Sequence, residues 1–274
     1  MKKRRLLSEI NPFFYKLSTL KGIFIRHLQN TFSSVKFATE RSSKSFPALI
    51  DSESNDMIKK GPGINPDTQF GKAKNIEIAA NAMNGLVIHP GESFSFWKYV
   101  GKITPRRGFK AGRVIKNDRL IPGIGGGLCN LANTLNLLVL HSPLDVTEFH
   151  HHSDALNPEK GEHVPFGTGT SVAYNYVDYR FKNNTDQSFQ LLVWCKDNKL
   201  YAELRSQFNI KYTYKLLESD YHFSCEEGKY YRVSKIYREI IDASSHRVFK
   251  ELILKNHSEV MYDYDLIPQE LIGR

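Results

Sequence analysis

The chain of 274 residues has few cysteines and no long apolar run, and both absences restrict the class of protein. Three cysteines cannot build the disulfide framework of a small secreted domain, and they leave at least one thiol unpaired. We expect three reduced thiols, with a Cys195–Cys225 bridge and a free Cys129 as the alternative that the sequence leaves open. Because the sequence contains no run of about 20 apolar residues, it predicts no transmembrane helix.

The sequence also lacks the features of a secretory signal. Four basic residues, Lys2–Arg5, resemble the charged start of such a signal, but an uninterrupted apolar segment should follow them. Charged residues, among them Glu9, Lys16 and Lys21, interrupt every candidate segment. We therefore expect a soluble protein, either cytoplasmic or attached to the surface of a membrane.

The net charge of +9 is not spread evenly along the chain. Residues 1–45 contain ten Lys and Arg and two acidic residues, whereas the remaining 229 residues contain 28 basic and 27 acidic ones. The body of the chain is thus nearly neutral, and it carries no zinc-finger, helix-turn-helix or aromatic-basic RNA-binding pattern. We expect no nucleic-acid partner.

Composition and periodicity divide the chain into a basic segment (1–45), a central domain (46–206) and a β-rich C-terminal extension (207–274). Within the basic segment, apolar residues recur at helical spacing between Lys and Arg residues: Leu17, Leu20, Phe24 and Leu28. Such a helix can lie on an anionic membrane surface or dock on its own domain. Both interpretations remain open from the sequence.

Apolar patterns predict helices over 75–84 and from 128 onward. Residues 37–65 are rich in Ser, Asp, Asn, Gly and Pro, which is typical of a loop. Alternating or continuous apolar runs predict strands at 86–88, 93–97, 146–149, 172–181, 189–194, 200–204, 230–241 and 248–254. Short turns join the strands from 172 to 204 into a predicted meander. The fold class is therefore α+β, with a mostly antiparallel sheet packed against a central helix.

That central helix starts at a glycine-rich loop, Gly125–Gly127, which places Cys129 in its first turn. Cys129, Asn133 and Asn136 share one face of the helix, opposite an apolar stripe. Backbone N–H groups and the positive end of the helix dipole gather at a helix start, and we expect them to lower the pKa of the thiol. Cys129 is thus the candidate nucleophile, and the amides after Gly126 and Gly127 are the candidate oxyanion hole.

A thiol nucleophile needs an imidazole to accept its proton, and a histidine cluster follows about twenty residues downstream. On an extended chain His150 and His152 face the same side, so either is a candidate base. Asp154, Glu162 and His163 are weaker polar candidates nearby. Zinc chemistry is the alternative, because these side chains include the ligand types of a catalytic zinc site: Cys129, His150, His152 and His163.

Several motifs occur in an order that resembles the VanW family. Pro90–Trp97 is similar to its PGE-T/S-FSF segment, and Gly125–Asn130 to its GGG-L/I-C-Q segment. The downstream half of the family pattern follows in the same order: His152-Ser153, Val164-Pro165, Gly167, Tyr176-Val177-Asp178 and Phe181–Thr185. The resemblance covers roughly residues 45–205.

This resemblance implies a role in cell-wall metabolism linked to glycopeptide (vancomycin) resistance, with a peptidoglycan peptide or precursor as partner. It also implies a cysteine-dependent acyl transferase similar to an L,D-transpeptidase, in which Cys129 matches the family cysteine and His152 the family histidine. His150 matches a histidine of some relatives, and Asn130 and Asn133 are the expected substrate-binding amides. No cofactor and no metal are expected for this mechanism.

The chain departs from the family pattern at three positions. Asn130 stands where relatives usually have Gln, Ala132 replaces a Ser, and Gly169 replaces an Asp. If that Asp orients the histidine, then another acid must do so here, and the nearby candidates are Asp154, Glu162 and Asp178. A non-catalytic accessory protein that binds cell-wall precursors is therefore the second functional hypothesis.

Overall fold

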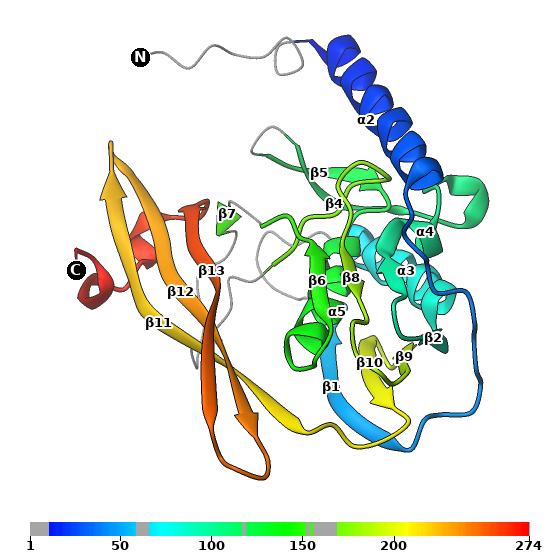
Figure 1. Cartoon of the computed structure of the whole chain (residues 1–274). Helices are drawn as coiled ribbons and strands as arrows, with labels where there is room; N and C mark the ends of the chain where they lie inside the picture. The colour runs from blue at the N-terminus through cyan, green and yellow to red at the C-terminus, as the bar shows by residue number, and fades with distance from the viewer. Residues whose placement is uncertain (1–10, 59–65, 117–118, 152–153, 156–168, 274) are drawn as a thin grey trace.

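The computed structural model describes residues 11–58, 66–116, 119–151, 154–155 and 169–273. It contains an α+β domain, a separate C-terminal sheet and a long N-terminal helix on the outer side of the domain (Figure 1). The strands pair almost entirely antiparallel, so the predicted fold class is confirmed. The described residues contain no helix with both the length and the apolar character needed to cross a bilayer.

The main sheet has the order β1-β10-β9-β2, and two helices, α3 and α5, pack against it. Its strands and helices have these bounds: β1 Ala48–Asp56, β2 Leu86–Ile88, β9 Phe189–Lys196, β10 Lys199–Ser206, α3 Pro66–Met83 and α5 Leu128–Leu140. The predicted apolar stripe of α5 is confirmed, since all its members are buried: Leu128, Leu131, Ala132, Leu135, Leu138 and Val139. This stripe fixes which face of α5 is left for polar residues.

A three-stranded sheet, β3-β8-β6, and a hairpin, β4-β5, complete the domain. These elements and the short α4 have the bounds β3 Ser93–Ser95, α4 Phe96–Val100, β4 Ala111–Lys116, β5 Arg119–Ile124, β6 Asp145–Glu148 and β8 Arg180–Lys182. Phe94 of β3 and Phe181 of β8 are register partners, and their rings stack at 4.6 Å between centroids. This aromatic pair belongs to the same buried core as the stripe of α5.

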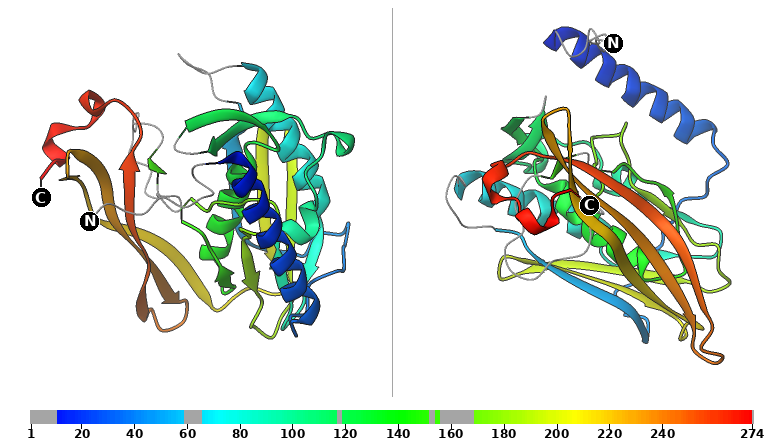
Figure 2. Two further views of the ribbon diagram at one scale, coloured as in Figure 1. Left: turned by 90° about the horizontal axis from the view of Figure 1, so that it is seen from above. Right: turned by 90° about the vertical axis from the view of Figure 1, so that its left-hand side faces the viewer.

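The C-terminal residues form a second sheet of order β11-β12-β13-β7, which lies beside the domain in Figure 2. Its strands are β11 Tyr212–Glu226, β12 Lys229–Asp242, β13 Val248–Val260 and the short β7 Asp154–Ala155. Three of them follow one another in the chain, and β7 joins the edge of β13 in parallel register from the central domain. The central domain therefore contributes strand β7 to the C-terminal sheet, and residues 207–211 connect β10 to that sheet along the chain.

Several sequence predictions need correction. Residues 48–56 form β1 rather than a loop, and α3 begins at Pro66 rather than at residue 75. The predicted strand 93–97 ends at Ser95, because α4 begins at Phe96. Residues 172–181 are not one strand, because Ala173 and Val177 bridge across a turn in which Asn175 has φ +51°. Only Arg180–Lys182 is extended there, and it pairs with β3 and β6 rather than with β9, so the predicted meander is wrong.

Candidate functional site

The first turn of α5 carries Cys129, and tight backbone packing fixes its position. Gly127 is the N-cap, with φ +95°, a conformation that strains any residue with a Cβ atom. A Cβ atom on Gly126 would lie 2.3 Å from the Gly112 carbonyl carbon in β4, and one on Gly127 would lie 2.2 Å from the Lys72 side chain in α3. The glycines thus let three elements meet at the start of α5.

The amide groups of this loop are partly committed to the fold. Gly126 N–H donates to the Gly123 carbonyl at 3.1 Å, and the Gly126 carbonyl accepts from Asn75 Nδ2 at 2.9 Å. The Gly126 amide is therefore a poor oxyanion donor. The first-turn amide of Asn130 already donates to the Gly127 carbonyl at 3.0 Å, so the amides of Gly127, Leu128 and Cys129 are better placed for that role.

Cys129 itself is partly buried, and its sulfur lies 4.0 Å from the Val172 carbonyl oxygen. Burial raises the pKa of the Cys129 thiol, which corrects the sequence prediction of a lowered value. Desolvation disfavours the thiolate more than the backbone groups near the helix start favour it. The resting sulfur is therefore a neutral thiol, and chemistry at Cys129 requires a base. The structure describes all three cysteines as free, Cys195 and Cys225 included.

The two asparagines predicted to bind substrate have different environments. Asn133 Oδ1 accepts a hydrogen bond of 2.7 Å from the Thr170 amide, so this side chain holds the segment 170–172 against α5. Asn130 Oδ1 is buried and has no hydrogen-bond partner among the described residues. A buried acceptor without a donor is costly unless a donor reaches it, which makes Asn130 a candidate ligand contact.

The segment 170–172 lies between α5 and the histidine cluster. Thr170 N–H and the Val172 carbonyl face Asn133 and Cys129, whereas Ser171 N–H donates to the His150 carbonyl at 2.7 Å. Successive residues of an extended chain direct their backbone groups to opposite edges, and this geometry follows that rule. Three of the predicted site residues, Cys129, Asn133 and His150, therefore contact one backbone segment, the first two from one side and His150 from the other.

The imidazole of His150 bonds to an acid that the sequence analysis missed. His150 Nε2 lies 2.9 Å from Glu148 Oε1, and no hydrogen bond joins His150 to Cys129 in the part of the chain that the structure describes. A signal was available, because Glu148 and His150 are two residues apart on an extended chain and so face the same side. Two other candidate histidines, His152 and His163, and Glu162 lie outside the described residues.

Glu148 is the centre of a partly buried ionic network. Arg26 of the N-terminal helix α2 (Pro12–Phe32) donates two hydrogen bonds to it, of 2.7 and 2.6 Å. Burial acts to raise the pKa of Glu148, but the hydrogen bonds from Arg26 and His150 outweigh it, so the net effect lowers the pKa. The acid is therefore ionised and orients the His150 ring by a charge-assisted hydrogen bond.

Asp178, one of the acids considered as a substitute for the family Asp, has a structural role instead. It is fully buried and accepts hydrogen bonds from Ser95 Oγ at 2.6 Å, Trp97 N–H at 3.1 Å and Arg180 Nε at 2.7 Å. These bonds join β3, α4 and β8 around one carboxylate. None of these three hydrogen bonds involves His150.

Among the described residues, one group has the ligand atoms of a metal site within 4.8 Å of one another: Asp51, Glu53 and His141. It lies at the far end of α5 from Cys129, because His141 is the C-cap of that helix. It therefore includes neither Cys129 nor His150, two of the four residues of the zinc hypothesis. The other two, His152 and His163, lie outside the described residues.

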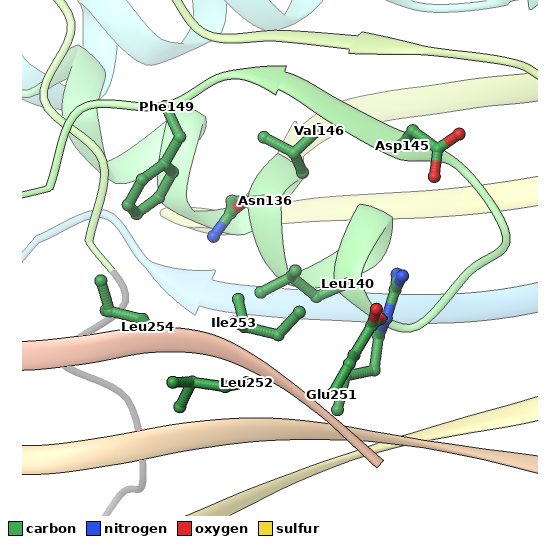
Figure 3. Close-up of a pocket in the computed structure, with 10 residues that line it drawn as sticks. Asn136, Leu140, Asp145, Val146, Phe149, Glu251, Leu252, Ile253 and Leu254 are labelled. Atoms are coloured by element: carbon green, nitrogen blue, oxygen red, sulfur yellow. The ribbon is translucent and has the colours of Figure 1, made fainter. Parts of the chain in front are cut away.

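A cavity of about 330 Å³ lies between the central domain and the C-terminal sheet (Figure 3). Asn136 and Leu140 of α5 face Leu252, Ile253 and Leu254 of β13 across it. Besides these apolar side chains its wall contains the polar Asn136 and three charged residues, Asp145, Arg238 and Glu251, of which Arg238 and Glu251 form an ion pair. Neither Cys129 nor His150 lines this cavity, although Asn136 lies on the same face of α5 as Cys129.

Comparison with known proteins places these features in a family. Residues 71–205 match the family model described as VanW like protein, and this range contains Cys129, the histidine cluster and the 170–172 segment. Across 260 residues the chain is 24% identical to the vancomycin B-type resistance protein VanW of Enterococcus faecalis, covering 94% of each chain. An uncharacterized protein, YoaR, of Bacillus subtilis is 31% identical over 116 residues, 42% of this chain and 37% of its own length.

No solved structure shows a significant match to the chain. The two motif segments, Pro90–Trp97 and Gly125–Asn130, both lie within the range that the family model matches. Residues 71–205 of the chain are therefore a domain of the VanW family.

Proposed function

We propose that this chain takes part in cell-wall metabolism linked to vancomycin resistance, as a cysteine-dependent acyl transferase on peptidoglycan peptides. The first part rests on the family and on the relative of Enterococcus faecalis, which is similar along 94% of both chains. The second part rests on one observation: Cys129 begins α5 at one edge of the segment 170–172, while His150 pairs with the other edge.

In the proposed reaction, the Cys129 sulfur attacks a carbonyl carbon of the peptide stem while an imidazole accepts the thiol proton. The first-turn amides after Gly127 stabilise the negative charge on the carbonyl oxygen. Collapse of this intermediate forms a thioester, and the imidazolium returns its proton to the departing amine. A second amine then attacks the thioester and gives its proton to the imidazole, which restores the thiol.

The raised pKa of Cys129 determines which form of this mechanism is proposed. A thiol that is neutral at rest cannot act as a preformed thiolate, so proton transfer must accompany attack. His152, the match to the family histidine, is the proposed base. The Glu148–His150 pair fixes the start of the histidine cluster, and His150 is the alternative base.

The test is thioester trapping with a peptide-stem substrate, read by intact-protein mass. Wild type should gain the mass of the acyl group, and Cys129→Ala should gain none and lose turnover entirely. Cys225→Ala is the matched control, because Cys225 is an exposed thiol in the C-terminal sheet. Turnover that persists in Cys129→Ala contradicts the enzymatic proposal. Replacing His152 and His150 in turn by Ala identifies the base by the larger loss of turnover.

A non-catalytic role is the second candidate, and the thiol itself favours it. Its contact with the Val172 carbonyl and its raised pKa are also what a structural cysteine would show. In that case Cys129→Ser retains both the affinity for a peptidoglycan precursor and the resistance phenotype. An enzyme loses the phenotype in Cys129→Ser even though the precursor still binds.

A further inference from the structure

The N-terminal helix α2 contacts the domain through its polar side. Arg26 pairs with Glu148, His27 Nε2 lies 3.0 Å from Asn175 Nδ2, and Asn30 Oδ1 accepts from Arg180 at 2.7 Å. Gly22 lies on the same side, where a Cβ atom would be 3.1 Å from the Tyr176 Cβ. The residues less exposed than their neighbours recur at helical spacing, which confirms that one face docks: Tyr15, Thr19, Gly22, Arg26 and Asn30.

The opposite side of α2 exposes an apolar stripe to solvent. Its members recur at intervals of three and four residues and are between 42% and 66% exposed: Phe13, Leu17, Leu20, Phe24 and Leu28. Phe14, Ile25 and Phe32 are exposed beside them. An apolar surface of this size on a helix marks a site of contact with another molecule or a membrane. Figures 1 and 2 show α2 at the periphery of the molecule.

Basic residues accompany this stripe. Lys16 and Lys21 are exposed on α2, and Lys2–Arg5 precede it in the sequence. Ten of the 38 Lys and Arg residues fall within residues 1–45, against two acidic residues. A helix with an apolar side and flanking cations has the charge complementary to an anionic lipid surface. An apolar groove on a partner protein would also cover the stripe, but it would not account for the excess of basic residues beside the stripe.

We infer that α2 binds the surface of an anionic bilayer, with Phe13, Leu17, Leu20, Phe24 and Leu28 inserted among the lipids. Lys16 and Lys21 then lie at the level of the phosphate groups, where their charge is balanced. The polar side of α2 keeps its contacts with Glu148, Asn175 and Arg180, so binding requires no rearrangement of the domain. The helix lies along the surface and does not cross the bilayer.

The test is sedimentation of the full chain with vesicles of phosphatidylglycerol and phosphatidylcholine in equal amounts. The triple substitution Phe13→Ser, Leu20→Ser and Phe24→Ser should lower the partition coefficient by roughly 100-fold. The variant lacks three apolar side chains whose transfer from water into the lipid favours binding. Lys16→Gln with Lys21→Gln should lower the partition coefficient by roughly tenfold on these vesicles. Phe208→Ser, which removes an exposed aromatic side chain outside α2, should leave the partition coefficient unchanged.

Any one of three results would overturn the inference. The first is a wild-type chain that does not sediment with the anionic vesicles, and the second is a triple variant that sediments as well as wild type. The third is wild-type binding to pure phosphatidylcholine vesicles that equals its binding to the anionic ones. Light scattering of the same variants tests the other occupant, a second copy of the chain. A dimer that the triple substitution converts to a monomer, without any vesicle binding, assigns the stripe to self-association. None of these readouts depends on the activity proposed for Cys129.

Discussion

Different interactions stabilise the central domain and the C-terminal sheet. In the central domain, α3, α5 and the main sheet enclose one continuous core, and backbone segments approach each other closely at Gly71, Gly112 and Gly126. Among the described residues, the C-terminal sheet has a small core of its own, formed by Phe223, Val260 and Ile267. Apolar residues of β13 such as Val248 and Phe249 are more than half exposed.

This difference predicts in which region a substitution changes the free energy of unfolding most. Long antiparallel ladders and surface ion pairs order the C-terminal sheet, and such contacts each contribute little to the free energy of unfolding. The central domain depends instead on burial and on close packing, which tolerate little change in volume. The matched substitutions below compare the two regions, in order of decreasing effect.

The largest difference is expected for two glycines. Gly126→Ala should lower the free energy of unfolding by about 3 kcal/mol or more, because its Cβ atom would lie 2.3 Å from the backbone of Gly112. Gly228→Ala, between β11 and β12, should lower it by about 1 kcal/mol, since φ is +79° there but the added Cβ atom would meet no atom within 4 Å beyond its chain neighbours. Urea titration measures both. Equal losses would show that close packing does not distinguish the two regions.

A smaller difference is expected for two ion pairs. Glu148→Gln removes the carboxylate between Arg26 and Arg180, whose side chains are 16% and 12% exposed, and should destabilise the chain by about 2 kcal/mol. Asp220→Asn breaks an exposed pair with Lys235 in the C-terminal sheet and should leave the melting temperature unchanged.

The pH dependence checks the Glu148 result. The folded pKa of Glu148 is lowered, so its contribution is present above the usual carboxyl pKa of about 4.3 and is lost as the pH falls through the folded value. The destabilisation caused by Glu148→Gln should therefore disappear in acid. A loss that persists at low pH would mean that packing, not charge, is responsible.

The smallest effect is expected for His141, because the hydrogen bond that its Nδ1–H donates to the Asp51 carboxylate raises the pKa of His141. A raised folded pKa gives stability that is complete below the usual value and is lost as the pH rises through the folded one. The wild-type free energy of unfolding should fall by about 0.5 kcal/mol between about pH 6 and about pH 9, and His141→Gln should abolish that fall. His257→Gln, in an exposed pair of the C-terminal sheet, should not change it.

Local patterns were sufficient to predict some elements but not others. The stripe of α5 and the strands β9, β10, β12 and β13 follow directly from apolar periodicity. Strand β1 was missed because its sequence, ALIDSESND, is mostly polar and typical of a loop, and it becomes a strand only by pairing with β10. The turn at Asn175 was missed because alternation over 172–181 is indistinguishable from that of a strand.

The candidate site shows the same limit. The position of Cys129 at a helix start was predictable, but its pKa was not, because burial depends on the distant segment 170–172. The role of Glu148 was not predictable from any motif, since it depends on Arg26, which is 122 residues away in sequence. Interactions between remote segments set the chemistry of residues that local patterns can only locate.

The contact between Arg26 and Glu148 joins the N-terminal helix to the central domain. One end of this connection is a helix with its apolar side outward, and the other end is the imidazole of His150. Two side chains, Arg26 and Glu148, thus separate the helix from the ring of His150. A partner that shifted α2 would therefore also act on the position of His150.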